Sequence, residues 1–268
     1  MTQPTLSAHQ INVESYGEGA RKVVALHCAL GRAASWKPFG QRFGGDICIK
    51  APDLPGHGKS APWSNPEPLR DISRAIVDEL AGDEQIDLVG HSYGGLVALE
   101  YATRFSHKVR SLTLIEPIYL AVAGRDNRPV LDAYLAQMQP HVEALSQSNH
   151  AQAAALFLDT WGSGVEFDDL PAPVREGLIR QIPIVAACEP GDETGAEEQL
   201  TLEGLKALTM PVSLIYGEQT LPVVKQVMQG LKQRLPDAQL LEVPAAGHMV
   251  PITHTEAVAM QLESFWKL

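Results

Sequence analysis

The chain has 268 residues, of which 45% are hydrophobic and 20% charged, a composition typical of a globular protein. Its 21 basic and 32 acidic residues give a formal net charge of −11, which disfavours nucleic acid and acidic membrane surfaces as partners. No stretch approaches the ~18 uninterrupted apolar residues of a membrane span, and the N-terminus lacks the pattern of a secretory signal.

The first 117 residues alternate short apolar runs with amphipathic segments, as in a mostly parallel sheet covered by helices. Runs rich in β-branched residues predict the strands, and apolar residues at helical spacing predict the helices. The predicted strands span residues 22–28, 46–53, 85–90 and 109–116, and the predicted helices span residues 68–82 and 94–105.

After Pro117 the pattern changes. Residues 118 to about 205 contain no comparable strand, and their helical stretches are separated by Gly, Pro and acidic clusters. This segment has 4 basic and 14 acidic residues, so it carries −10 of the total charge. The alternation then returns, with strands predicted at 211–217 and 238–244 and helices at 222–235 and 254–268. The sequence therefore predicts one doubly wound α/β core, residues 1–117 and 206–268, interrupted by a helical insert, residues 118–205.

The stretch QIDLVGHSYGGLVALEYA joins a strand directly to a helix through Gly90-His91-Ser92-Tyr93-Gly94. So tight a hinge forces its central residue into an unfavourable backbone conformation and leaves the Ser92 hydroxyl exposed above the sheet. Unpaired N–H groups at the helix N-terminus suit a developing oxyanion. Ser92 is therefore the candidate nucleophile, and the alternative is a serine that merely caps a helix.

A serine nucleophile needs a base that titrates near neutrality. His248 lies in a loop of small residues, after the last predicted strand and before the final helix, and is the candidate base. His27, His57 and His91 also lie beside strand ends, but each belongs to a turn in which we expect a structural role.

Four motifs together resemble the α/β-hydrolase superfamily: LHCALGRAASW (26–36), DLPGHGKS (53–60), GHSYGG (90–95) and AGHM (246–249). The resemblance covers essentially the whole chain and implies a cap, formed by the insert, that follows the sixth strand of the family's sheet. It also implies an oxyanion hole made by the backbone N–H groups of Tyr93 and Ala29. One departure is visible, because Cys28 stands where the family usually has a glycine after His27.

The family's acid is expected at the fourth position of the turn after its seventh strand, and that position is Thr220. Glu116 ends the preceding strand of the sheet, next to the strand that ends at Gly217, and its carboxylate could reach the same imidazole. We therefore expect a Ser92, Glu116, His248 triad in the family's chain order. Glu218, a carboxylate from the cap, or no acid at all are the alternatives.

This machinery predicts cofactor-independent hydrolysis of a small carboxylic ester through an acyl-enzyme. Hydrolysis of a lactone or a C–C bond, perhydrolysis, and a catalytically silent ligand-binding protein remain open. A C–C hydrolase of this kind would need a cation for its carboxylated substrate, and Arg32, Arg125 and Arg128 are the candidates. Acidic residues at the entrance would instead favour a neutral substrate. Aromatic residues of the insert could line an apolar pocket or pack the insert's own core: Tyr119, Tyr134, Phe157, Trp161 and Phe167.

The remaining expectations concern location and partners. An odd number of cysteines without CxxC spacing, Cys28, Cys48 and Cys188, indicates reduced thiols and a cytoplasmic location. The histidines are scattered and no HExxH motif occurs, so neither a metal nor another cofactor is expected. The expected partner is a small, neutral substrate, and a homodimer is one of the oligomeric states that the sequence leaves open.

Overall fold

The computed structural model describes residues 5–63, 67–188, 201–235 and 237–268, and its centre is a seven-stranded sheet. The strand order is β1-β3-β2-β4-β5-β6-β7, and every neighbouring pair is parallel except β1 with β3. The strands are β1 (Val13–Tyr16), β2 (Arg21–Leu26), β3 (Ile47–Pro52), β4 (Ile86–His91), β5 (Val109–Ile115), β6 (Val212–Gly217) and β7 (Gln239–Val243). The predicted mostly parallel, doubly wound fold is confirmed.

Strand β1 was not expected from the sequence. Its four residues, VESY, are antiparallel to β3 at the edge of the sheet, and none of them is fully buried. A short, half-exposed edge strand does not need the continuous apolar run that marks the buried parallel strands. Strand β4, in contrast, is buried along its whole length, and its pattern was recognisable.

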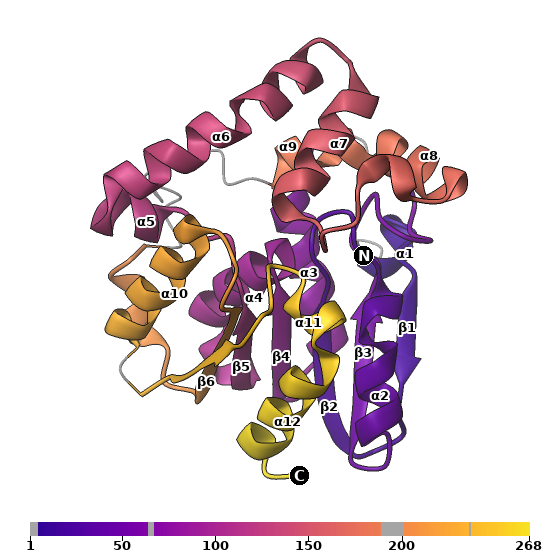
Figure 1. The fold of residues 1–268 in the computed structure, drawn as a ribbon. Coiled ribbons are helices and arrows are strands. Elements are labelled where there is room, and N and C mark those ends of the chain that lie inside the picture. Colours follow the sequence, from indigo (N-terminus) through magenta and orange to yellow (C-terminus); the bar gives the residue numbers. More distant parts are fainter. Residues whose placement is uncertain (1–4, 64–66, 189–200, 236) are drawn as a thin grey trace.

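Helices cover both faces of the sheet (Figure 1). The short helix α1 (Thr5–Ala8) packs on α3. One apolar cluster joins the sheet to α3 (Leu69–Ala81), α4 (Tyr93–Arg104) and α10 (Pro222–Arg234). A second joins the other face to α2 (Lys37–Phe43), α11 (Val250–Thr253) and α12 (Thr255–Trp266). Helix α4 is buried along most of its length because it packs against both the sheet and α3.

Between β5 and β6 the described residues form helices and no strand. These are α5 (Ala121–Asp126), α6 (Arg128–Ser146), α7 (His150–Trp161), α8 (Ala172–Gln181) and α9 (Val185–Cys188), which we call the insert helices. In the view of Figure 1, α6 to α9 lie above the sheet, and α5 lies beside α10. The acidic cluster that the sequence places at 192–198 lies outside the described residues.

No helix among the described residues is long and apolar enough to span a lipid bilayer.

Candidate active site

Ser92 lies at the tip of a sharp turn between β4 and α4. Its backbone has φ 56° and ψ −117°, a strained combination for a residue with a side chain. The turn is tight enough that a side chain at Gly90 would collide with the backbone of Gly94, and one at Gly94 with the backbone of Leu26. Glycines at these two positions therefore permit the turn, which presents the Ser92 hydroxyl to a cavity above the sheet.

The expected oxyanion donors are the N–H groups of Tyr93, which directly follows Ser92, and of Ala29, which lines this cavity. Tyr93 is the first residue of α4, and Ala29 lies in the loop after β2, the strand that pairs with β4. Within the described part of the chain, neither N–H has a hydrogen-bond acceptor. Two unpaired donors beside Ser92, one at a helix N-terminus, form an arrangement suited to an oxyanion.

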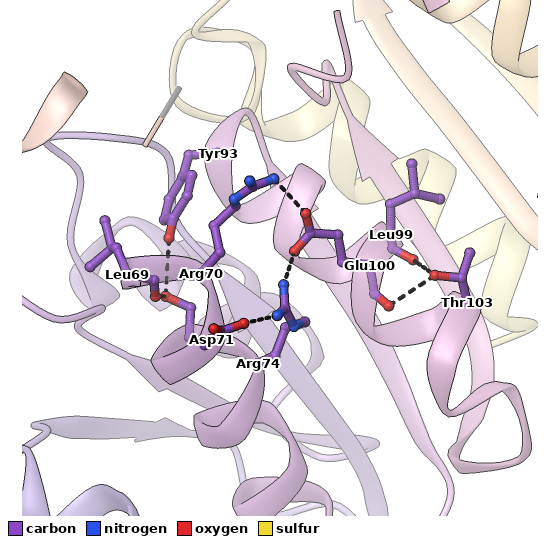
Figure 2. Close-up of polar contacts among 9 residues, drawn as sticks. Leu69, Arg70, Asp71, Arg74, Tyr93, Leu99, Glu100 and Thr103 are labelled. Carbon is purple, nitrogen blue, oxygen red and sulfur yellow. Dashed lines mark hydrogen bonds and ion pairs between the residues drawn. The ribbon is translucent and has the colours of Figure 1, made fainter. Parts of the chain in front are cut away.

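The Tyr93 side chain is not among the residues that line the cavity, and it reaches from α4 to α3 (Figure 2). Its hydroxyl makes a 3.1 Å hydrogen bond with Ser73, and burial raises its pKa well above the usual value. Beside it, the buried Glu100 accepts from Arg70 at 2.7 Å and from Arg74 at 2.5 Å. These contacts hold α4, and with it the turn carrying Ser92, against the neighbouring helix.

The carboxylate of Glu116 contacts the imidazole of His248. Nδ1 of His248 lies 2.6 Å from Oε2 of Glu116, and both side chains are buried. Glu116 directly follows β5 and has φ 46°, an uncommon value for a non-glycine residue. A carboxylate at this distance holds a proton on Nδ1 and leaves Nε2 as the basic ring nitrogen.

Thr220 completes the environment of the carboxylate. Its hydroxyl donates to Oε2 of Glu116 at 2.6 Å, and the N–H of Gly217 donates to Oε1 at 2.7 Å. The expectation that the strands ending near Glu116 and Gly217 are neighbours is confirmed by the pairing of β5 with β6. Thr220 therefore binds the carboxylate of Glu116, a contact that sequence reasoning missed because a single hydroxyl does not indicate which group it binds.

Glu218, the alternative acid, contacts a different part of the loop. Its exposed carboxylate accepts from the N–H of Ala245 at 2.9 Å, so it braces the turn that precedes His248.

Two further side chains hold His248, and neither was assigned this role from the sequence. His91, next to Ser92, makes a 2.9 Å hydrogen bond from Nε2 to the backbone oxygen of His248. Burial lowers the pKa of His91 well below its usual value, so it acts as a neutral donor. Trp161, at the end of α7, packs edge-on against the His248 ring with centroids 4.5 Å apart. One indication for His91 was present in the sequence, which is its place in the turn next to Ser92. None was present for Trp161, because that contact comes from an insert helix far away in the chain.

The other strand-end histidines have structural roles, as expected. His27 accepts from the N–H of Leu54 at 2.9 Å, and burial lowers its pKa to about 3. His57 bonds to the backbone oxygen of Pro55 at 3.0 Å, and burial lowers its pKa to about 4. Both therefore stay neutral near pH 7 and are unsuited to the proton transfer that a serine nucleophile requires.

A cavity of about 520 Å³, counting the part open to solvent, connects Ser92 with His248. Its walls combine the sheet edge with the insert helices. The lining residues are Cys28, Ala29, Ser92, Ile118, Leu120, Tyr134, Phe157, Trp161, Val185, Cys188, His248 and Met249. Three of the insert aromatics named from the sequence line this cavity, whereas Tyr119 packs in the main core and Phe167 packs within the insert.

Among the described residues, no group of three or more His, Cys, Asp or Glu side chains is arranged to bind a metal ion. Cys28, Cys48 and Cys188 all lie among the described residues, and none of them forms a disulfide.

Comparison with known proteins identifies relatives along nearly the whole chain. The model of the "Alpha/beta hydrolase family" matches residues 23–261. A protein named lipase LipV, from Mycobacterium tuberculosis, is 28% identical, and the alignment covers 95% of this chain and 97% of the relative. A pimeloyl-[acyl-carrier protein] methyl ester esterase from Aromatoleum aromaticum is 30% identical, over 80% of this chain and 86% of the relative.

Solved structures with the same fold include an epoxide hydrolase from Bacillus megaterium, at a TM-score of 0.74 and 18% identity, covering 96% of this chain and 97% of that one. Est816, described as an N-acyl homoserine lactone degrading enzyme, has a TM-score of 0.70 and 20% identity, covering 95% and 96%. Such low identities establish the fold alone.

Proposed function

The chain belongs to the alpha/beta hydrolase family, and from that premise we propose that it hydrolyses a small carboxylic ester through an acyl-enzyme formed on Ser92. The observation that carries this proposal is the 2.6 Å contact between Glu116 and His248, in a cavity that His248 shares with Ser92. Relatives named as a lipase and as methyl ester esterases support the reaction class.

In the proposed mechanism, His248 removes the proton of Ser92 as the serine oxygen attacks the ester carbonyl. The imidazole becomes positively charged, and the buried Glu116 carboxylate stabilises that charge while it fixes the ring. The N–H groups of Tyr93 and Ala29 bind the oxyanion; removing one such donor typically costs about 10²–10³-fold in kcat. His248 then gives its proton to the leaving alcohol.

Water completes the reaction. His248 activates it for attack on the acyl-enzyme, a second oxyanion forms at the same donors, and the acid product leaves with Ser92 regenerated. Each proton transfer in this series of reaction steps uses an acid or base that the chain itself supplies.

We also propose that the insert helices act as a cap. They contribute Tyr134, Phe157, Trp161, Val185 and Cys188 to the cavity wall, and Trp161 contacts the base directly. A cap of this kind would exclude water from the oxyanion and hold the acyl group in place.

The test is labelling with a fluorophosphonate probe, followed by peptide mapping, together with turnover of p-nitrophenyl butyrate. We expect one probe per chain on Ser92 and ester turnover that the probe abolishes. Ser92→Ala, which removes only the hydroxyl, should neither be labelled nor turn over the ester. A folded wild-type protein that fails in both assays would contradict the proposal and favour the silent ligand-binding alternative.

A further inference from the structure

The cavity next to Ser92 has an uncharged wall. Apart from Ser92 and His248, the described lining residues bear aliphatic, aromatic, thiol or thioether side chains, and the phenol of Tyr134 is the one further polar group among them. Burial raises the pKa of the Cys28 thiol to about 12, so this residue is neutral across the working range of pH. An acyl group bound here would therefore contact hydrocarbon, sulfur, the Tyr134 phenol, Ser92 and His248, and no permanently charged side chain of the described residues.

The described lining residues include no lysine or arginine that would change this character. Arg32, Arg125 and Arg128, the residues considered from the sequence as partners for a substrate carboxylate, are exposed and do not line the cavity. The residues that the structure does not describe, 1–4, 64–66, 189–200 and 236, include no lysine, arginine or histidine. The sequence therefore offers no basic side chain from those segments either.

An unpaired carboxylate buried in such a wall loses its hydration without gaining a partner, whereas an apolar chain gains from leaving water. Each methylene group removed from water improves binding by about fourfold. The negative Glu116 carboxylate behind His248 adds repulsion for a second anion. A charge at the far end of the acyl chain should therefore affect kcat/KM more strongly than the length of that chain does.

We propose that this site selects esters with an uncharged, apolar acyl group and rejects those whose acyl chain ends in a carboxylate. The inference rests on the proposed function and narrows its substrate class, and it argues against the carboxylated substrate of the C–C hydrolase alternative.

Dimethyl adipate tests the inference in one reaction, because its first hydrolysis product, monomethyl adipate, is the charged form of the same acyl chain. We expect release of methanol to stop after one equivalent. With the two esters as separate substrates, kcat/KM for monomethyl adipate should be lower by about 100-fold or more. Methyl heptanoate, of similar length, should be hydrolysed at least as well as dimethyl adipate.

A substitution in the wall provides the converse test. Phe157 lines the cavity from α7 and is only partly buried, so Phe157→Arg brings a cation to the acyl group at modest cost to folding. We expect the variant to raise kcat/KM for monomethyl adipate relative to dimethyl adipate by about tenfold or more. Val174→Arg is the control, because it introduces an arginine at an exposed position of α8 outside the cavity wall. Its ratio of kcat/KM values for the two adipate esters should stay at the wild-type value.

The outcomes separate the inference from the function on which it rests. Equal kcat/KM values for the two adipate esters, or release of both methanol equivalents at similar rates, would overturn the selectivity and leave the esterase proposal standing. No turnover of any of the three esters, with no fluorophosphonate labelling of Ser92, would overturn the function and the selectivity together.

Discussion

The N-terminal and C-terminal ends of the parallel strands form two opposite edges of the sheet. Each of these edges buries a carboxylate, but the two edges balance its charge differently. At the edge where the parallel strands begin, Asp87 on β4 accepts from Arg21 at 2.6 and 2.9 Å, from Arg110 at 2.8 Å and from Ser111 at 2.6 Å. Two permanent cations therefore hold this carboxylate, and its interactions do not depend on any proton transfer.

At the opposite edge, Glu116 is equally buried, but no arginine or lysine of the described residues pairs with it. Among the described residues, its hydrogen-bond partners are the N–H of Gly217, the hydroxyl of Thr220 and the imidazole of His248. Its charge is fully compensated only when the imidazole carries a proton, which is the state that forms during attack by Ser92 in the proposed mechanism. The permanent charges of the two arginines thus stabilise the fold at Asp87. At Glu116 the counter-ion is the imidazolium of His248, which forms only during the proposed reaction.

Glu116→Gln should have the largest effect. The amide keeps the size of the side chain but cannot balance an imidazolium, and it presents an N–H where His248 needs an acceptor. We expect kcat to fall by about 10³–10⁴-fold with the fold intact. Steady-state kinetics and circular dichroism measure the two parts, and near-normal turnover in a folded Glu116→Gln protein would exclude Glu116 as the acid.

Asp87→Asn should show the opposite pattern. It leaves two arginines without their carboxylate, but both reach solvent, so we expect a loss of about 2–3 kcal/mol in the free energy of unfolding, somewhat below the range for fully buried pairs. Ester turnover of the folded protein should be unchanged. Urea unfolding and kinetics at a temperature below the transition test this, and a large fall in kcat would contradict the contrast between the edges.

Sequence reasoning could place most of the core because the parallel strands are continuous apolar runs and the motifs at their ends are local. It could also place Glu116 beside His248, since adjacent parallel strands end at one edge. It could not find Trp161 against His248, because that contact depends on how a helix far away in the chain packs over the sheet. Nor could it assign Thr220, since one hydroxyl gives no sign of which carboxylate it binds.

The edges should also respond differently to acid, because the buried histidines that follow strands, such as His57, lie at the edge that carries the site. The pKa of His57 is about 4 in the folded protein and about 6.5 when unfolded, so below pH 6.5 the unfolded state binds more protons. Its contribution is complete above pH 6.5 and is lost as the pH falls toward 4, at about 1.4 kcal/mol per pH unit. His57→Asn retains a donor for Pro55 and should flatten this dependence in urea unfolding at pH 7, 6 and 5. Parallel curves for the two proteins would contradict the assignment.

Thr220→Val should have the smallest effect and is the most sensitive test of the edge that carries Glu116. The substitution preserves shape but removes the O–H donated to Glu116, a bond to a charged group worth about 1.5 kcal/mol. If that donor holds the carboxylate toward His248, kcat should fall by about tenfold with KM unchanged, and Thr220→Ser, which keeps the hydroxyl, should recover most of the loss. Equal activity of the Val and Ser variants would show that the N–H of Gly217 alone orients the Glu116 carboxylate. The hydroxyl at position 220 would then have no part in orienting it.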